Sequence, residues 1–354
     1  MRKLVKHIVL GINLLAVLAL CGAYFSGFIS PEKNWIPAFL GLAYPVILAV
    51  NFGFMIFWLI FSPKYVLLSL VTIIAGWGYL TRFVQLQEKT TGEAEIKVLS
   101  FNVHHFRGTG ELSHHETANE IIRFLKEEQP DIICLQEVRL RQNNIFNLAQ
   151  TVEELDFINH YQFARTSNTF GSVTLSRYPI VHMDEIRFGN SRNITIYTDV
   201  LIGEDTVRIF NVHLHSYGID PRDFAIIEQG VSTEEDLKEA REMGSKLKKG
   251  SQMRAGQVET IRERIEKTNY PVILCGDLND IPASFSYQQL RKGLKDAFVS
   301  SGKGMGQTYV NKLPFLRIDY IFHSPFFESF HFKTHDFRHS DHLPVSTELV
   351  KKRR

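Results

Sequence analysis

The amino-acid sequence predicts an α/β domain that follows a helical membrane segment. Charge separates the two parts, because residues 1–80 hold only six of the 78 charged side chains in this 354-residue chain. From residue 96 onward, apolar runs of strand length alternate with charged, helix-like stretches, which is the pattern of an α/β fold. Several of these runs are apolar at both odd and even positions, as expected for strands in a sheet that is covered on both faces.

Three apolar runs in the first 81 residues are candidates for membrane-spanning helices. Ile8–Ile29 and Trp35–Phe61 are uncharged runs of 22 and 27 residues, each long enough to cross a hydrocarbon core of about 30 Å. A third run, Tyr65–Thr81, has 17 residues and lies at the lower limit of spanning length. A cleaved signal peptide is not favoured, because further apolar runs follow the first. We therefore expect residues 1–81 to anchor the chain in a lipid bilayer through two to three transmembrane helices.

The basic residues of this segment predict its orientation. Arg2, Lys3 and Lys6 place the N-terminus in the cytoplasm, and Lys64 agrees with a cytoplasmic second loop. Three crossings would then place the following domain on the outer side of a bacterial-type plasma membrane. If the third run does not span, the domain returns to the cytoplasm, and this alternative stays open.

The polar stretch 82–95 is interpreted as a linker, and residues 96–354 as one catalytic domain. The predicted strands are Ile96–Val103, Asp131–Val138, Ser172–Ser176, Ile194–Ile202, Val207–His215, Pro271–Leu278, Ile318–His323 and Leu343–Leu349. The predicted helices are Glu116–Glu128, Glu234–Lys248 and Gln252–Lys267. Residues 216–256 are interpreted as a charged helical insertion in this domain.

Composition and charge exclude some classes of protein and weaken another. Three cysteines in so long a chain make no disulfide framework, and 44% hydrophobic residues exclude a disordered chain. The net charge of +2 is the sum of +4 for residues 1–80 and −2 for the remainder. Nucleic-acid binding relies on Lys and Arg to neutralise phosphates, so this balance weakens a nuclease interpretation. A local basic patch could still form from Lys246, Lys248, Lys249, Arg254 and Lys303.

Side chains that can bind a metal ion or transfer a proton cluster near the ends of six strand-like runs. They are Asn102, Glu137, His213 with His215, Asp277 with Asn279, Asp319, and Asp341 with His342. Ligands and catalytic groups in α/β folds gather at strand ends. Because alternate residues of a strand share a face, Asp277 and Asn279 should point the same way.

Two adjacent histidine pairs, His104–His105 and His114–His115, have the composition of a metal site. Adjacent residues on a strand point to opposite faces, however, so neither pair could present both rings to one ion. We interpret both pairs as surface loop histidines.

Five short motifs in a fixed order give the part of the chain after the linker its resemblance to a known family. FNV, QEV, GDLND, RIDYI and SDHLPV follow one another between Glu95 and Val350. In this order they resemble the endonuclease/exonuclease/phosphatase superfamily, which has the deoxyribonuclease-I-like fold. The resemblance implies a four-layer α/β/β/α sandwich, in which two packed mixed sheets are flanked by helices and the site lies at one edge.

The residue types also indicate the chemistry. Glu137, Asp341 and the amide of Asn102 offer oxygen atoms, and hard oxygen ligands favour Mg²⁺ or Mn²⁺ over zinc. Such an ion neutralises a phosphoryl oxygen and stabilises the departing oxyanion. His342 is the candidate base that activates water, and Asp319 would hold its ring in one tautomer.

The resemblance implies roles for three further residues. Asp277 would position or deprotonate the water or protonate the leaving oxygen, Asn279 would bind the phosphate, and His213 would donate to a phosphate oxygen. The division of labour between Asp277 and His342 stays open.

These inferences predict a membrane-anchored, divalent-metal-dependent phosphoester hydrolase that uses in-line attack of water on phosphorus. Its substrate is either a nucleic acid or a phospholipid or sphingolipid headgroup. The alternative from another class is an inactive domain of the same superfamily that serves as a membrane-tethered binding or scaffolding module. The intact set of predicted ligands and bases argues against that alternative.

Overall fold

A computed structural model describes residues 3–352, apart from residues 91, 93, 109, 140–146, 167–168, 190, 220–229, 231 and 311–315. Arg2 and part of the predicted 216–256 insertion therefore lie outside the described residues. The chain divides into two compact units. The first comprises residues 1–83, 217–255 and 281–289, and the second comprises residues 84–216, 256–280 and 290–354.

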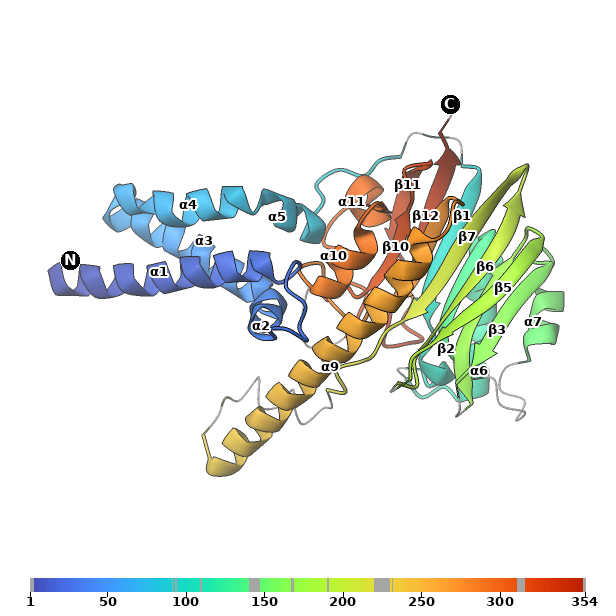
Figure 1. Cartoon of the computed structure of the whole chain (residues 1–354), viewed down its shortest axis with the longest axis horizontal. Helices are drawn as coiled ribbons and strands as arrows, with labels where there is room; N and C mark the ends of the chain where they lie inside the picture. The colour runs from blue at the N-terminus through green and yellow to red at the C-terminus, as the bar shows by residue number, and fades with distance from the viewer. Residues whose placement is uncertain are drawn as a thin grey trace. The chain divides into compact units, whose positions relative to one another are not determined.

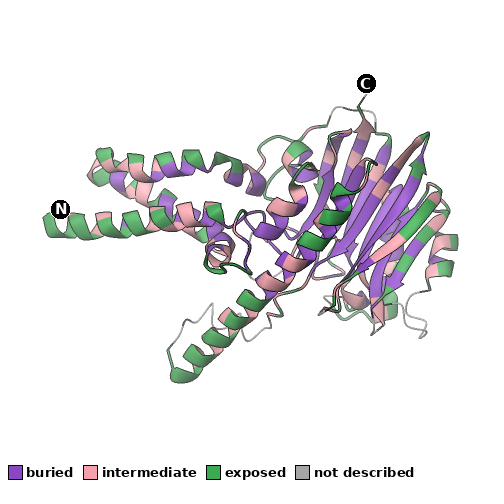
Figure 2. Ribbon diagram, in the orientation of Figure 1, coloured by how far each residue is buried: buried purple, intermediate pink, exposed green. Residues whose placement is uncertain are grey.

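The first unit contains the apolar helices. Two of them, α1 (Lys3–Phe25) and α3 (Tyr44–Phe61), are long and apolar enough to cross a membrane. Much of their surface is exposed (Figure 2), including Leu15 at 67% and Ile60 at 69%. Large apolar side chains exposed along a whole helix are expected where lipid, and not water, surrounds the protein.

The two other apolar runs differ in detail from their prediction. Trp35–Phe61 is divided into α2 (Ile36–Leu42) and α3, because Pro45 in the first turn of α3 disfavours a helix that continues into it. The third run forms η1 (Pro63–Tyr65), α4 (Val66–Ala75) and α5 (Trp77–Phe83), with a bend of 66° at the break between Ala75 and Trp77. If this bent pair is one span, the segment has three.

The second unit is built on two six-stranded sheets (Figure 1). Their orders are β11-β12-β1-β2-β4-β3 and β5-β6-β7-β8-β10-β9. Both are mixed, because β1–β2 and β7–β8 pair in parallel among antiparallel neighbours. The strands of the first sheet are β1 (Ile96–Asn102), β2 (Ile132–Arg139), β3 (His160–Arg165), β4 (Phe170–Ser176), β11 (Phe327–Thr334) and β12 (Val345–Lys351). Those of the second are β5 (Ile180–Arg187), β6 (Ile194–Ile202), β7 (Asp205–His213), β8 (Val272–Asp277), β9 (Lys295–Asp296) and β10 (Asp319–His323).

The two sheets pack face to face, and helices flank them. On β1, Ile96 and Val98 join the core between the sheets, whereas Leu99 and Phe101 join the core under α6 (His114–Glu128). This arrangement confirms the predicted four-layer sandwich and explains why the central strands are apolar at both parities. The remaining helices are α7 (Leu148–Glu154), α9 (Glu234–Glu266), α10 (Phe285–Arg291) and α11 (Ala297–Ser301), and α9 is continuous where two helices were predicted.

One buried polar contact links the sheets near the strand ends. Gln136 of β2 donates from Nε2 to Oδ1 of Asn211 on β7 at 2.8 Å, and Asn211 donates to the carbonyl of Val173 on β4 at 2.9 Å. Gln136 and Asn211 are fully buried, so breaking one partner would leave the other unsatisfied. The contact fixes the position of β2, which carries Glu137, relative to the second sheet.

Candidate functional site

Three neighbouring strands of the second sheet bring polar side chains to one edge. In the register of the sheet, His213 of β7 and Asp319 of β10 both lie opposite Asp277 of β8. Strand pairing alone therefore brings together three of the predicted site residues, although they span more than 100 positions in the sequence.

The backbone around Asp277 explains the GDLND motif. Gly276 has φ of 140°, and a Cβ at this position would lie 1.9 Å from the carbonyl oxygen of Val212 on β7. Only glycine fits so close an approach. After the strand, Asn279 takes a left-handed conformation with φ of 49°, and its N–H donates to Oδ1 of Asp277 at 2.7 Å. Asn279 also donates from Nδ2 to Oδ2 of Asp277 at 3.0 Å, so it orients both oxygens of this carboxylate.

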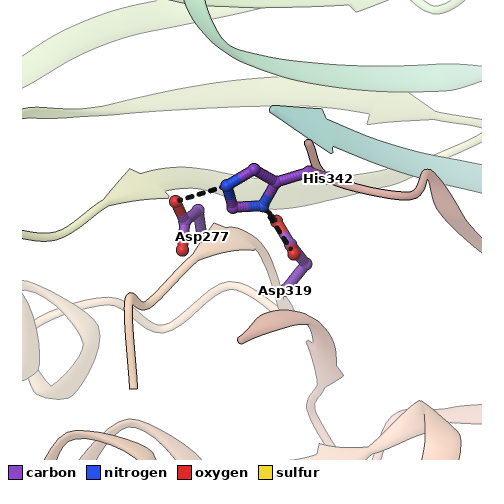
Figure 3. A group of neighbouring side chains, drawn as sticks. All are labelled: Asp277, Asp319 and His342. Atoms are coloured by element: carbon purple, nitrogen blue, oxygen red, sulfur yellow. Dashed lines mark hydrogen bonds and ion pairs between the residues drawn. The ribbon is translucent and has the colours of Figure 1, made fainter. Parts of the chain in front are cut away.

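Asp277, Asp319 and His342 form what we call the buried trio (Figure 3). His342 Nδ1 lies 2.9 Å from Oδ2 of Asp319, and its Nε2 lies 3.8 Å from Oδ2 of Asp277. The two aspartates are 1% exposed and His342 is 5% exposed. The predicted His342–Asp319 pair is therefore in contact, and Asp277 faces the other ring nitrogen.

The pKa values within the buried trio indicate its protonation. Burial alone would lower the pKa of His342, but the carboxylates of Asp319 and Asp277 outweigh it and raise that pKa to about 10. Burial raises the pKa of Asp277 to about 6, although the His342 cation opposes this shift. At neutral pH His342 is thus protonated, and Asp277 is the group whose pKa lies near neutrality.

Within the part of the chain that the structure describes, the buried trio is also the group with the spacing of a metal cluster, its ligand atoms lying within 4.8 Å of one another. Its geometry argues against that use. The two nitrogens of His342 point away from each other, and each faces a different carboxylate. An ion bound to one ring nitrogen would lie beside only one of the two aspartates. The trio is therefore better described as a chain of charged hydrogen-bonding groups.

Glu137 is directed into the site by an irregularity in β2. The pairing of β2 with β4 shifts register between Leu135 and Val138, and Glu137 within this bulge has φ of 53°. Its Oε1 lies 3.2 Å from Nε2 of His213. Burial would raise the pKa of Glu137, but the hydrogen bond and charge of His213 outweigh it and hold the pKa well below its usual range. Glu137 is therefore a carboxylate at neutral pH, as a metal ligand must be.

Asn102, at the end of β1, connects the two carboxylates. Its Nδ2 donates to Oδ2 of Asp277 at 3.0 Å and to Oε1 of Glu137 at 3.3 Å, while its oxygen accepts the N–H of His104 at 3.0 Å. The sequence predicts that the Asn102 oxygen binds metal. In this arrangement the amide nitrogen, and not that oxygen, faces the carboxylates.

We expected His104 and His105 to be surface loop histidines, but both rings contact carboxylates of the site. His104 Nδ1 lies 3.2 Å from Oδ1 of Asp341, and His105 Nε2 lies 3.1 Å from Oε2 of Glu137. The argument from strand geometry is wrong here because β1 ends at Asn102 and the chain then forms a short 3₁₀ turn, η2 (His104–Phe106). We call His104, His105, Glu137 and Asp341 the outer ligand group.

The remaining predicted residues take different positions. His213 is 6% exposed and contacts Glu137, as described above. The backbone N–H of His215 donates to Oε1 of Gln257 on α9 at 2.8 Å. His114, of the second histidine pair, begins α6 and contacts Arg139 through Nδ1 at 3.1 Å, and His115 contacts Asn119 at 3.3 Å. The carboxylates of Glu137 and Asp341 are the oxygen donors that a divalent cation such as Mg²⁺ or Mn²⁺ accepts.

Comparison with known proteins agrees with this architecture. Residues 99–342 match the family model described as the Endonuclease/Exonuclease/phosphatase family, and residues 6–83 match a domain of unknown function. No curated protein matches the chain.

Solved structures are similar at low sequence identity. An endonuclease/exonuclease/phosphatase family protein from Leptotrichia buccalis is 19% identical with a TM-score of 0.52, covering 72% of this chain and 99% of its own. The human Nocturnin catalytic domain with bound sulfate is 17% identical with a TM-score of 0.52, covering 76% and 97%. A mannosyl-6-phosphatase from Bacteroides thetaiotaomicron is 19% identical with a TM-score of 0.50, covering 72% and 99%. At these identities the likeness supports a shared fold.

Proposed function

Because the chain belongs to the endonuclease/exonuclease/phosphatase family, we propose that it is a membrane-anchored phosphoester hydrolase that depends on a divalent metal ion. The observation that carries the proposal is the connected set of Glu137, Asn102, Asp277, His342 and Asp319, which are linked by successive contacts of 2.9 to 3.8 Å. An inactive scaffold would have no need to keep a charged histidine between two buried carboxylates, since burying unneeded charge is costly.

The residues of the buried trio have distinct roles in this proposal. Asp277, whose pKa lies near neutrality at about 6, accepts the proton of the attacking water. Asp319 holds the His342 ring and keeps it protonated, so that its Nε2–H can donate to a phosphoryl oxygen as charge develops there. His342 is thus an electrostatic donor in this proposal and no longer the base predicted from the sequence.

The residues around the trio position the reacting groups. Asn279 and Asn102 both donate to Asp277 and fix the direction of its free lone pairs. His213 and Glu137 support each other at 3.2 Å, and Glu137 with Asp341 would hold the divalent ion. That ion, when bound, supplies neutralisation of a phosphoryl oxygen and stabilisation of the leaving oxyanion.

A substrate at the bilayer, such as a phospholipid or sphingolipid headgroup, is favoured over nucleic acid. Of the five residues predicted to form a basic patch, Arg254 is fully buried against the Tyr217 ring, and Lys248 lies over the ring of Trp35. A nuclease would instead need several exposed cations along one track.

The enzymatic proposal is tested with the full chain in detergent micelles. We expect hydrolysis of bis-p-nitrophenyl phosphate in the presence of Mg²⁺ or Mn²⁺, loss of hydrolysis with chelator, and loss in Glu137→Ala. The matched control is Asp205→Asn, which alters a partly exposed carboxylate paired with Lys351. Equal activity in Glu137→Ala and wild type would overturn the enzymatic interpretation in favour of the binding module. Sphingomyelin, phosphoinositides and plasmid DNA then discriminate the substrate, and cleavage of DNA alone would establish the nuclease alternative.

Contacts among the apolar helices support three crossings. Along α1, Lys6 lies 5.0 Å from the ring of Tyr65, Asn13 donates to Ser69 at 2.9 Å, and Tyr24 donates to the carbonyl of Thr72 at 3.1 Å. The Tyr79 hydroxyl of α5 then donates to the carbonyl of Tyr24 at 2.5 Å. Residues later in α1 contact residues later in the segment from Tyr65 through α4 to α5. The bent pair α4–α5 therefore runs parallel to α1.

The remaining long apolar helix, α3, runs antiparallel to α1. Trp58 of α3 donates to Asn13 of α1 at 2.9 Å, whereas the earlier residue Asn51 donates to the carbonyl of the later residue Ala16 at 3.1 Å. Two helices in one direction and one in the other amount to three crossings. We propose that the catalytic domain lies across the membrane from the N-terminus.

Labelling of single cysteines tests this topology. In a chain without its native cysteines, Glu111→Cys, at an exposed position of the catalytic domain, should react with a membrane-impermeant maleimide added to intact cells or spheroplasts. Lys3→Cys at the N-terminus should react only after lysis. The reverse pattern, or protection of both sites in intact cells, would overturn the proposal.

A further inference from the structure

A groove runs between α1 and α4, which lie side by side in the first unit (Figure 1). Its volume is about 670 Å³, within the range of about 300 to 1,000 Å³ that is usual for small-molecule sites. The hydroxyl of Thr72, which lines it, donates to the carbonyl of Leu68 at 2.8 Å. The other walls are apolar, and they include Leu10, Leu14 and Val17 of α1 and Leu68 and Val71 of α4. The groove therefore fits an apolar ligand.

The groove is elongated and open along its side. Leu10, Leu14 and Val17 recur at the spacing of one helix face, so this wall follows the axis of α1. At 1.5 Å per residue, the stretch from Leu10 to Val17 is about 10 Å long. One leaflet of a hydrocarbon core about 30 Å thick is about 15 Å deep. Leu14 and Val71 are 49% and 60% exposed, so a ligand can enter from the side. This length and opening suit an acyl chain within one leaflet.

One end of the groove is cationic. Lys64 lines the groove next to Tyr65, and its Nζ lies 5.2 Å from the centre of the Tyr65 ring. Lys6 precedes Leu10 by about one helical turn on the same face of α1, and its Nζ lies 5.0 Å from the same ring. Two ammonium groups from different helices therefore meet at the end of the groove that is nearer the N-terminus.

The helical segment does not neutralise these two cations itself. Glu32 is the only acidic residue among residues 1–87, and it follows the end of α1 that is opposite to Lys6. The Tyr65 ring between the cations is held in place by the ring of Trp58, whose centre lies 5.0 Å away. Trp58 in turn donates to Asn13 of α1 at 2.9 Å. The cationic end is thus preformed, and its charge is complementary to an anion.

We propose that the groove binds an anionic phospholipid, with an acyl chain between α1 and α4 and the headgroup phosphate beside Lys6 and Lys64. Basic pockets between transmembrane helices bind the headgroups of anionic lipids. A zwitterionic lipid carries a cation of its own, which the two ammonium groups repel, so the site discriminates by net charge.

The bound lipid is distinct from the substrate of the proposed function. In the proposed topology the N-terminus lies in the cytoplasm, so this lipid occupies the cytoplasmic leaflet and the catalytic domain lies across the membrane. The inference rests on the membrane anchoring in that proposal and not on hydrolysis. It assigns to the anchor a lipid-binding site that tethering alone does not require.

Native mass spectrometry of the full chain, released from detergent micelles in the presence of a chelator, tests the proposal without using activity. The probes are phosphatidylglycerol and phosphatidylethanolamine with identical acyl chains, offered together in equal amounts. We expect the wild type to retain phosphatidylglycerol in preference to phosphatidylethanolamine. In Lys6→Gln/Lys64→Gln, retention of phosphatidylglycerol should fall on the order of 10-fold, to the level of the zwitterionic lipid.

The apolar part of the groove is tested by Val71→Trp, which fills it and should lower the retention of both lipids. Its matched control is Val46→Trp, at an exposed apolar position of α3 outside the groove, which should leave retention unchanged. The control for charge is Lys33→Gln/Lys238→Gln, which removes two exposed lysines outside the groove and should keep the preference for phosphatidylglycerol.

Equal retention of the two lipids by the wild type would overturn the proposal. A preference lost equally in Lys33→Gln/Lys238→Gln, or a wild-type dimer without bound lipid, would also overturn it, and the dimer would assign the groove to a second copy of the chain. Hydrolysis of bis-p-nitrophenyl phosphate is measured in parallel. If the wild type hydrolyses it without selecting a lipid, the proposed function stands and this inference fails, and selection without hydrolysis gives the reverse. If the chain stays monomeric and soluble without detergent, the membrane anchoring and this inference both fail.

Discussion

The buried trio and the outer ligand group lie in one site but are built in opposite ways. The trio is supplied by strand ends and the turn before β12, and its members are at most 5% exposed. The side chains of the outer ligand group are 20% to 31% exposed and come largely from a bulge and a left-handed turn. Strand ends and the turn before β12 thus supply the groups that we propose transfer protons, whereas irregular backbone supplies Glu137, one of the two groups that we propose hold the ion.

This difference predicts how each part responds to mutation. Inside the trio, each charge is neutralised by another protein group, so nothing added to the solution should replace a lost member. In the outer ligand group, the charges would be neutralised by an ion, so a higher concentration of that ion should compensate for a weakened ligand. Four predictions follow this contrast from the largest effect to the smallest.

Asp277→Asn should cause the largest loss. Removing the proposed base should lower kcat on the order of 10³-fold, because general-base catalysis contributes about that factor. The bound metal should be retained, since Asp277 is not among the proposed ligands. Steady-state kinetics with metal titration measure both quantities, and recovery of kcat at high Mn²⁺ would contradict the assignment.

Glu137→Gln should cost on the order of 10²-fold at low metal concentration, because the neutral amide is a weaker ligand than the carboxylate. Unlike Asp277→Asn, this variant should regain most of its activity as Mn²⁺ is raised. Activity is measured across a metal titration, with Asp205→Asn as the control for loss of a carboxylate outside the site. A deficit that is independent of metal concentration would remove Glu137 from the ligand set.

Asp319→Asn should cost on the order of 10-fold in kcat and should also change the pH profile. Asp319 is the largest favourable influence on the His342 cation, and the pKa of His342 is about 10 with this carboxylate present. Without it the pKa falls toward its ordinary value, so His342 loses its proton at lower pH. The alkaline limb of the pH–rate profile should therefore move to lower pH, and an unchanged limb would show that His342 protonation is not required.

The smallest predicted effect is on the free energy of unfolding. It concerns His323, a fully buried histidine that differs from His342 in its surroundings. His323 on β10 has no carboxylate in contact within the described residues, and burial lowers its pKa to about 4. Because the unfolded state binds the proton more readily, stability is lost as pH falls from about 6.5 to about 4. The loss amounts to about 3 kcal/mol at most.

Urea unfolding of the full chain in detergent, followed by pulse labelling of the buried thiol of Cys275, measures this dependence. His323→Leu should flatten it between about pH 6.5 and about pH 4. The exposed-histidine control His182→Leu should keep the wild-type slope. A slope unchanged in His323→Leu would place the acid sensitivity elsewhere.

Sequence patterns predicted the central strands well and missed the edges. Each of the eight predicted strands has an observed counterpart, with ends that differ by a few residues. The four strands not predicted are β11, β3, β5 and β9, which are the edges of the two sheets. A strand in the middle of a sheet is buried on both faces and is therefore mostly apolar, whereas an edge strand such as β5 is largely exposed and mixes polar with apolar residues.

In the candidate site, too, some residues were predicted from the sequence and others were not. The order of the five motifs was sufficient to name Asn102, Glu137, Asp277, Asp319 and His342, and the register of β7, β8 and β10 then brings Asp277 and Asp319 together. His104 and His105 were misplaced because their position depends on where β1 ends. The nearest local signal was the pair of histidines that follows Asn102 after one residue, which by itself does not indicate a left-handed turn.

The sequence by itself determined three features of this protein. They are an apolar segment with few charges, an α/β domain, and the chemical types of the groups at the strand ends. These are local properties, set by hydrophobic period and by residue identity. Tertiary structure decided which nitrogen of His342 meets which carboxylate, that Asn102 presents its amide nitrogen, and that two histidines reach Glu137 and Asp341. Those outcomes depend on strand register, a bulge and left-handed backbone, which arise from contacts between residues far apart in the chain.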